Sequence, residues 1–80
     1  MNPENAENQV HKYIVETAII EHTDRKVFLK AVTEHKDKLL DDGFKVEVHY
    51  QVAVLPGYTP SIKHFMYIEG RKLNEEYLGL

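Results

Sequence analysis

The chain has 80 residues, no cysteine and a formal net charge of −3. A chain of this length forms one domain at most, and it buries only about 60% of the surface that its unfolded form exposes. Disulfides and thiolate metal sites are excluded, so oligomerisation is the expected way to stabilise the small core. The acidic balance argues against binding to nucleic acid or to an anionic membrane, and no run approaches the ~20 apolar residues of a membrane span.

The N-terminal stretch MNPENAENQV is polar. Residues 1–8 are predicted to form a disordered arm, because polar termini of this composition rarely order themselves. The stretch has neither a basic n-region nor an apolar h-region, so no signal peptide is predicted and the cytoplasm is the expected location.

A first strand is predicted over residues 9–21, where β-branched and aromatic side chains dominate. Both faces of this strand are apolar, and a strand of that kind is usually covered on both sides. One face carries Tyr13, Val15, Thr17 and Ile19, and the other carries Ile14, Ala18 and Ile20.

A helix is predicted over residues 24–42. Thr23 or Asp24 can cap its start, and Gly43 followed by Phe44 predicts a Schellman-type end in which Phe44 packs back on the last turn. Apolar residues recur at spacings of three and four along one stripe. The stripe contains Val27, Phe28, Ala31, Val32, His35, Leu39 and part of Leu40.

A long hairpin follows, with strands over residues 44–55 and 61–70 and a loop near residues 54–60. Strict alternation places one set of side chains against the helix. That set is Val46, Val48, Tyr50, Val52, Ile62, Met66 and Ile68. We expect the register that pairs Lys45 with Glu69 and Gln51 with Lys63, because the alternative places Glu47 opposite Glu69, a like-charge pair.

The tail, residues 71–80, is apolar enough that docking is expected, with Asn74 capping one helical turn. Residues 9–80 are thus predicted to form a single α+β domain of order β-α-β-β, a three-stranded sheet with one helix on one face. A right-handed crossover makes the first two strands parallel. The third strand then lies between them, or the first strand pairs on the outer side of the second.

The second face of the sheet is left without a cover in this arrangement, and such apolar patches mark interfaces or ligand sites. A second subunit, the tail, or both would cover it, and a two-fold homodimer is the commonest solution. The candidate partner- or ligand-binding residues are His49, Gln51, Phe65, Tyr67 and, on the first strand, Tyr13.

No motif in the sequence carries a chemistry. The five histidines lack zinc-ligand spacing, and no serine or carboxylate pair has a catalytic setting. His64 is expected to bond to backbone or to Tyr50. We therefore predict no catalytic residue, no metal, no cofactor and no enzymatic activity.

The amphipathic helix ending near Leu39-Leu40, the strand FKVEVHYQVAV, a polar loop and the strand HFMYIEGR resemble a family of very short sporulation-expressed proteins of Bacillus-type bacteria. The resemblance covers roughly residues 12 to 70 and implies the strand-helix-strand-strand topology and a bacterial host. The order of elements is also similar to that of the dodecin flavin-storage proteins. This chain has no tryptophan to stack on an isoalloxazine, so flavin is not expected.

The sequence therefore favours a small non-enzymatic accessory protein of a bacterium or phage, which acts through protein–protein interaction or homo-oligomerisation on its open sheet face. The alternative is a binder of an aromatic or nucleotide-like small molecule, with a site between subunits. Neither hypothesis involves nucleic acid or a membrane.

Overall fold

The computed structural model describes residues 11–77. It contains β1 (Tyr13–His22), α2 (Arg25–Asp41), β2 (Lys45–Leu55) and β3 (Ser61–Leu73), which confirms the predicted β-α-β-β order and α+β class. The predicted N-terminal arm, residues 1–8, lies outside the described residues. β3 continues to Leu73, beyond the end predicted at residue 70. No helix within residues 11–77 is long and apolar enough to cross a membrane.

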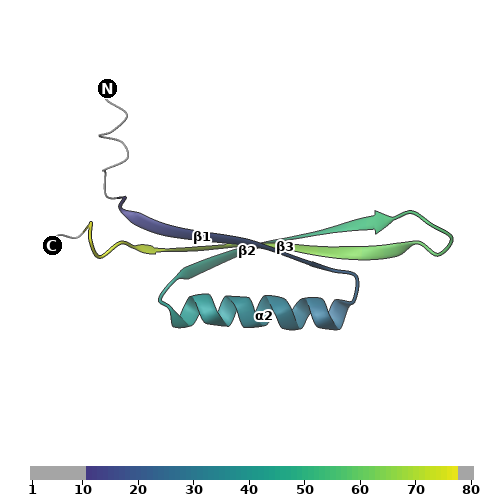
Figure 1. The fold of residues 1–80 in the computed structure, drawn as a ribbon, viewed down its shortest axis with the longest axis horizontal. Coiled ribbons are helices and arrows are strands. Elements are labelled where there is room, and N and C mark those ends of the chain that lie inside the picture. Colours follow the sequence, from purple (N-terminus) through teal and green to yellow (C-terminus); the bar gives the residue numbers. More distant parts are fainter. Residues whose placement is uncertain (1–10, 78–80) are drawn as a thin grey trace, which may run out of the picture.

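The three strands form one sheet in the order β1-β3-β2, and β3 is antiparallel to both neighbours. Of the two expected strand orders, the structure has the one with β3 in the centre. The helix α2 lies along one face of this sheet, and no described element lies on the other face (Figure 1). The connection through α2 makes β1 and β2 parallel, as expected for a crossover of this kind.

The predicted register of the hairpin is wrong: each residue of β2 lies opposite a residue two positions farther along β3 than expected. β2 and β3 pair Lys45 with Arg71 and Glu47 with Glu69, so the like-charge pair is present. The prolines agree with the observed register. The observed ladder continues to the pair Leu55 with Ser61 and leaves only residues 56–60, with a proline at each end, in the loop. The expected register must end at Ala53 with Ser61 to keep Pro60 out of the ladder, and it therefore has a longer loop.

Both ends of α2 are capped by the residues that the sequence indicated. The Asp24 side chain accepts a hydrogen bond from the Val27 N–H at 3.1 Å. At the other end Gly43 has a φ of 89°, the Gly43 N–H donates to the Leu40 carbonyl, and the Phe44 N–H donates to the Leu39 carbonyl, both at 3.0 Å. These two bonds are the Schellman pattern, and they turn the chain directly into β2.

The core is small and lies under the helix. It consists of Phe28, Val32, Leu39, Phe44 and Ile68, with Ile20, Val46 and Met66 packed against it. The predicted apolar stripe of the helix is only partly buried, because Val27 and Leu40 are 46% and 51% exposed. A core of this size leaves most apolar side chains of the sheet in contact with solvent.

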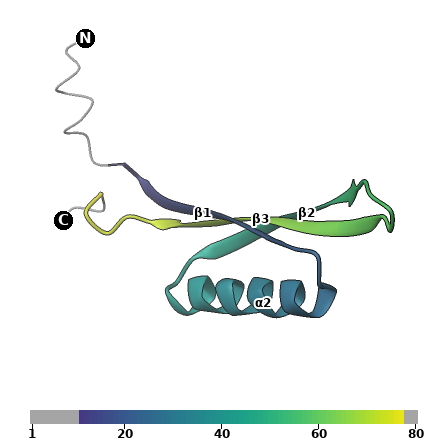
Figure 2. The same cartoon turned by 45° about the vertical axis from the view of Figure 1, so that its right-hand side comes forward.

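The helix is too short to cover the sheet. Its 17 residues span about 26 Å, whereas the 13 residues of β3 span about 44 Å. β1 ends opposite His64, and beyond that point β2 and β3 continue as a two-stranded ribbon. We call residues 52–64 the hairpin arm; Figure 2 shows it extending past the start of α2.

The expectation that Val52 and Ile62 pack against the helix is wrong. Val52 and Ile62 lie on the predicted side of the sheet, but they are 53% and 51% exposed because the arm extends past the first turn of the helix, which therefore does not cover them (Figure 2). Val54, in the same row as Ile62, is 69% exposed. The helix side of the arm is therefore an uncovered apolar surface.

Candidate functional site

The sheet face opposite the helix, which we call the open face, carries the odd-numbered residues of all three strands. Alternation along each strand puts them on this side, because the even-numbered residues Val46, Met66 and Ile68 pack with the helix. Several large apolar side chains on this face are exposed. They are Tyr13 at 43%, Val15 at 47%, Ile19 at 67% and Tyr67 at 38%.

Four of the five predicted site residues come together near the middle of the open face. His49 lies opposite Tyr67, with ring centroids 6.0 Å apart and planes inclined by 38°. Gln51 lies opposite Phe65 in the next row. The expected register had placed His49 near Phe65, so the observed register changes its neighbour. On the other side of β3, Ile19 lies opposite Tyr67 and widens the apolar strip.

Tyr13 does not join this cluster. It lies opposite Leu73, six residues along β3 from Tyr67 and therefore about 20 Å away. Its ring is 5.7 Å from the Arg71 guanidinium and 5.5 Å from the Lys12 ammonium. Tyr13 therefore belongs to the charged end of the sheet, where cations stack on its face.

Charges form two rows beside the central cluster, an arrangement that belongs to the register that we did not expect from the sequence. Lys45 and Arg71 make one row, and Glu47 and Glu69 make the next. Arg71 Nη2 donates to Glu69 Oε1 at 3.3 Å along the strand. Glu47 makes no ion pair with any residue between 11 and 77. The sequence shows a basic and an acidic residue two positions apart on each strand, Lys45 and Glu47 on β2 and Arg71 and Glu69 on β3. Only the observed register pairs the two basic residues with each other and the two acidic residues with each other.

The opposite border of the cluster is also charged. Lys63 Nζ lies 3.1 Å from Glu21 Oε1 and 5.6 Å from the centroid of the Phe65 ring. The apolar strip of Ile19, Phe65 and Tyr67 thus lies between two charged borders. Since both signs occur in each border, the face offers both donors and acceptors around an apolar centre.

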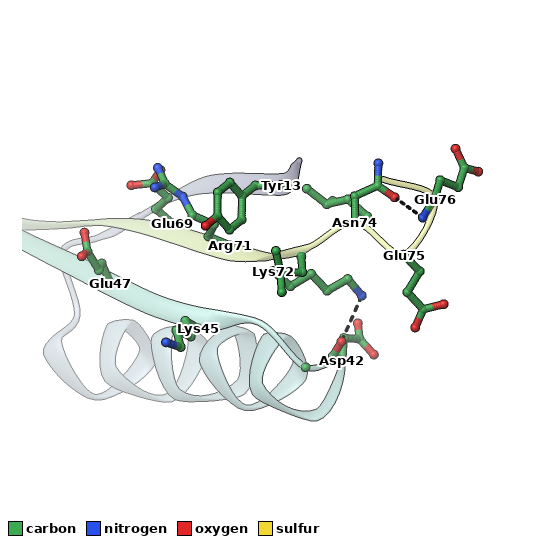
Figure 3. A pocket seen from close by; sticks show the side chains of 13 residues that line it. Tyr13, Asp42, Lys45, Glu47, Glu69, Arg71, Lys72, Asn74, Glu75 and Glu76 are labelled. Carbon is green, nitrogen blue, oxygen red and sulfur yellow. Dashed lines mark hydrogen bonds and ion pairs between the residues drawn. The ribbon is translucent and has the colours of Figure 1, made fainter. Parts of the chain in front are cut away.

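A first hollow lies at the end of the sheet where the chain leaves β3 (Figure 3). Lys72 Nζ donates to the Asp42 carbonyl oxygen at 3.0 Å and lies 4.4 Å from the Phe44 ring centroid. The Asn74 N–H donates to the Lys12 carbonyl at 2.8 Å, and Asn74 Oδ1 accepts from the Glu76 N–H at 3.1 Å, as expected for a capped turn. Up to Tyr77 the tail turns at this end and does not cover the open face; residues 78–80 lie outside the described part.

A second hollow lies on the helix side, at the base of the hairpin arm. It is lined by Arg25, Phe28, Leu29, Tyr50, His64 and Met66. The predicted contact of His64 with Tyr50 is confirmed, because the Tyr50 hydroxyl lies 2.6 Å from His64 Nδ1. The His64 ring also stacks on Phe28, with centroids 5.3 Å apart. His64 is therefore fixed by its contacts with Tyr50 and Phe28 and forms part of the lining of this hollow.

Within residues 11–77, no three His, Asp or Glu side chains gather into a set that could hold a metal ion. Neither of the two hollows is lined by His49, Gln51, Phe65 or Tyr67. The central cluster is therefore a surface of the sheet and not the wall of either hollow.

Comparison of the chain with protein-family models, with curated proteins and with solved structures gave no match.

Proposed function

We propose that this chain is a small non-enzymatic binding protein that docks a protein partner on its open face. The observation that carries the proposal is the apolar strip of exposed Ile19 (67%) and Tyr67 (38%) beside half-buried Phe65, set between charged borders. Protein interfaces have this anatomy, an apolar centre rich in aromatic residues and a polar rim. The formal net charge of −3 also suits a protein partner better than a nucleic acid.

The charge rows indicate the chemistry of the partner. Glu47 and Glu69 lie side by side, and cross-strand like charges destabilise a sheet by a few tenths to about 1 kcal/mol. Arg71 offsets the charge of Glu69 but not that of Glu47. A lysine or arginine of the partner, placed beside Glu47 while apolar side chains cover Tyr67, would relieve that repulsion in the complex.

The test is a capture experiment with immobilised full-length protein and a lysate of the source cells. We expect one protein to be retained by the wild type, lost with Ile19→Glu, and retained at least tenfold more weakly with Glu47→Lys, because that substitution reverses the charge offered to the basic side chain.

Two further measurements make this result specific. Glu47→Gln is expected to raise the free energy of unfolding by about 0.5 kcal/mol while it weakens capture, which separates recognition from stability. Val54→Glu, an exposed substitution on the opposite side of the sheet, should leave capture by immobilised protein in place. Equal retention by the wild type and Ile19→Glu would contradict the proposal.

A further inference from the structure

The helix side of the hairpin arm is an uncovered apolar surface separate from the open face. Val52, Val54 and Ile62 are all more than half exposed on a two-stranded ribbon, and such a ribbon is at best marginally stable alone in water. We propose that this surface is a dimer interface and that its occupant is the hairpin arm of a second copy of this chain. The inference goes beyond the proposed function, because it concerns a different face of the sheet.

The charge of the arm favours a second copy as the occupant. A two-fold interface places a surface against the same surface of the second copy, so residue i contacts residue j, and residues on the axis contact their own copies. The exposed apolar residues on the helix side of the arm are uncharged, namely Val52, Val54 and Ile62. The exposed apolar residues of the arm therefore add no like-charge contact in any two-fold alignment. The open face, with its Lys45–Arg71 and Glu47–Glu69 rows, avoids such contacts only where the axis sets the basic row of one copy against the acidic row of the other.

The empty space beside the helix also favours a second arm as the occupant. α2 occupies the layer next to the sheet, and this layer is vacant alongside the arm, beyond the start of the helix at Arg25 (Figure 1). Stacked sheets pack about 10 Å apart, close to the separation between a sheet and a helix packed on it. A second arm therefore fits in the vacant part of the layer, and the two-fold axis gives the partner's arm the same cover in return.

This stacking also explains the tip of the arm. Tyr58 is fully exposed in the loop between β2 and β3. With the two arms antiparallel, each tip reaches the base of the other arm, where the hollow lined by Arg25, Phe28, Leu29 and Tyr50 is located. We place the Tyr58 ring of one copy against this hollow in the other, where the Arg25 guanidinium and apolar walls suit an aromatic side chain.

The area is sufficient for a dimer of moderate affinity. Tyr58, together with the exposed parts of Tyr50, Val52, Val54 and Ile62, offers roughly 600 Å² per copy, against the ~800 Å² of a standard interface. We therefore expect a dissociation constant in the micromolar range. Both open faces remain on the outside of this dimer, so each dimer presents two copies of the proposed partner site and can bind a divalent target with avidity.

Sedimentation equilibrium of the full chain, at concentrations from about 1 to about 300 μM, tests the inference with a matched pair of variants. Val54 and Ile19 are 69% and 67% exposed, and they lie on opposite faces of the sheet. We expect the wild type and Ile19→Glu to approach twice the chain mass of 9.3 kDa, and Val54→Glu to stay at that mass with an unchanged far-UV circular dichroism spectrum.

A second measurement does not depend on the folding of a charged variant. The chain has no tryptophan, so Tyr58→Trp introduces a single tryptophan at the tip, whose emission can be excited separately from that of the tyrosines. Its emission is expected to shift to shorter wavelength as the concentration passes through the dissociation constant. A wild type that is monomeric throughout, a Val54→Glu variant that stays dimeric, dissociation caused by Ile19→Glu, or an emission maximum that is independent of concentration would each overturn the inference.

Discussion

Gly70 is the residue on which the helix–sheet contact depends. It is buried in β3, and a β-carbon placed there would lie 3.2 Å from Leu39 Cδ1 and 3.2 Å from Phe44 Cδ1. Both neighbours are core side chains with little room to move. Gly70→Val is therefore expected to lower the free energy of unfolding by about 2 kcal/mol through overpacking. Gly70→Ala should cost less than about 1 kcal/mol, because its smaller clash is offset by the lower backbone entropy of alanine in the unfolded chain.

Urea denaturation followed by circular dichroism measures both changes. The control is Ala53→Val, a similar enlargement of a half-buried strand residue on the open face, where a β-branched side chain is well tolerated. A Gly70→Val variant as stable as Ala53→Val would show that Leu39 and Phe44 can move aside.

At the scale of elements, local signals in the sequence predict more than long-range ones. The start and end of α2 follow from Asp24 and Gly43, whose side-chain and backbone chemistry act within a few residues. The hairpin register is not predicted by the charged residues, because cross-strand charge pairs contribute only a few tenths to about 1 kcal/mol. The two prolines that bound the loop agree better with the observed register, because it extends the ladder to Leu55 with Ser61 while it keeps both prolines out of the ladder.

The helix end gives a prediction at this scale. Gly43 has a φ of 89°, and a β-carbon added to it would meet no atom within 4 Å, so a substitution there encounters backbone strain alone. Gly43→Ala is expected to lower the free energy of unfolding by about 1 kcal/mol, and Gly43→Asn by about half as much, because asparagine tolerates the left-handed region better. Urea denaturation of the two variants checks the order. An alanine variant as stable as the wild type would mean that the turn can adopt another cap.

At the scale of the whole molecule, the sequence predicts the composition of the open face but not the reach of the sheet beyond the helix. Alternation alone places His49, Gln51, Phe65 and Tyr67 on one side, and the structure brings these four together. Tyr13 shares the face but lies at its far end, because a shared face says nothing about distance along a strand. The end of β1 at His22 lies within one residue of the predicted end, but the uncovered arm depends on which residue of β3 lies opposite that end, and hydrophobic periodicity does not give this alignment.

The dimer predicted from the arm has a thermodynamic consequence for the intact protein. When a folded dimer unfolds to separate chains, mass action makes the melting temperature rise with protein concentration. Above the dissociation constant, a tenfold increase in concentration should raise the melting temperature by about 3 °C for a chain of this size. Differential scanning calorimetry between about 30 and about 300 μM measures the shift, which requires reversible unfolding at both concentrations. In Val54→Glu the melting temperature should be independent of concentration, whereas Ile19→Glu should keep the wild-type dependence. An equal shift in wild type and Val54→Glu would place the subunit contact elsewhere on the molecule, because an arm interface cannot accept a buried glutamate from both copies without dissociating.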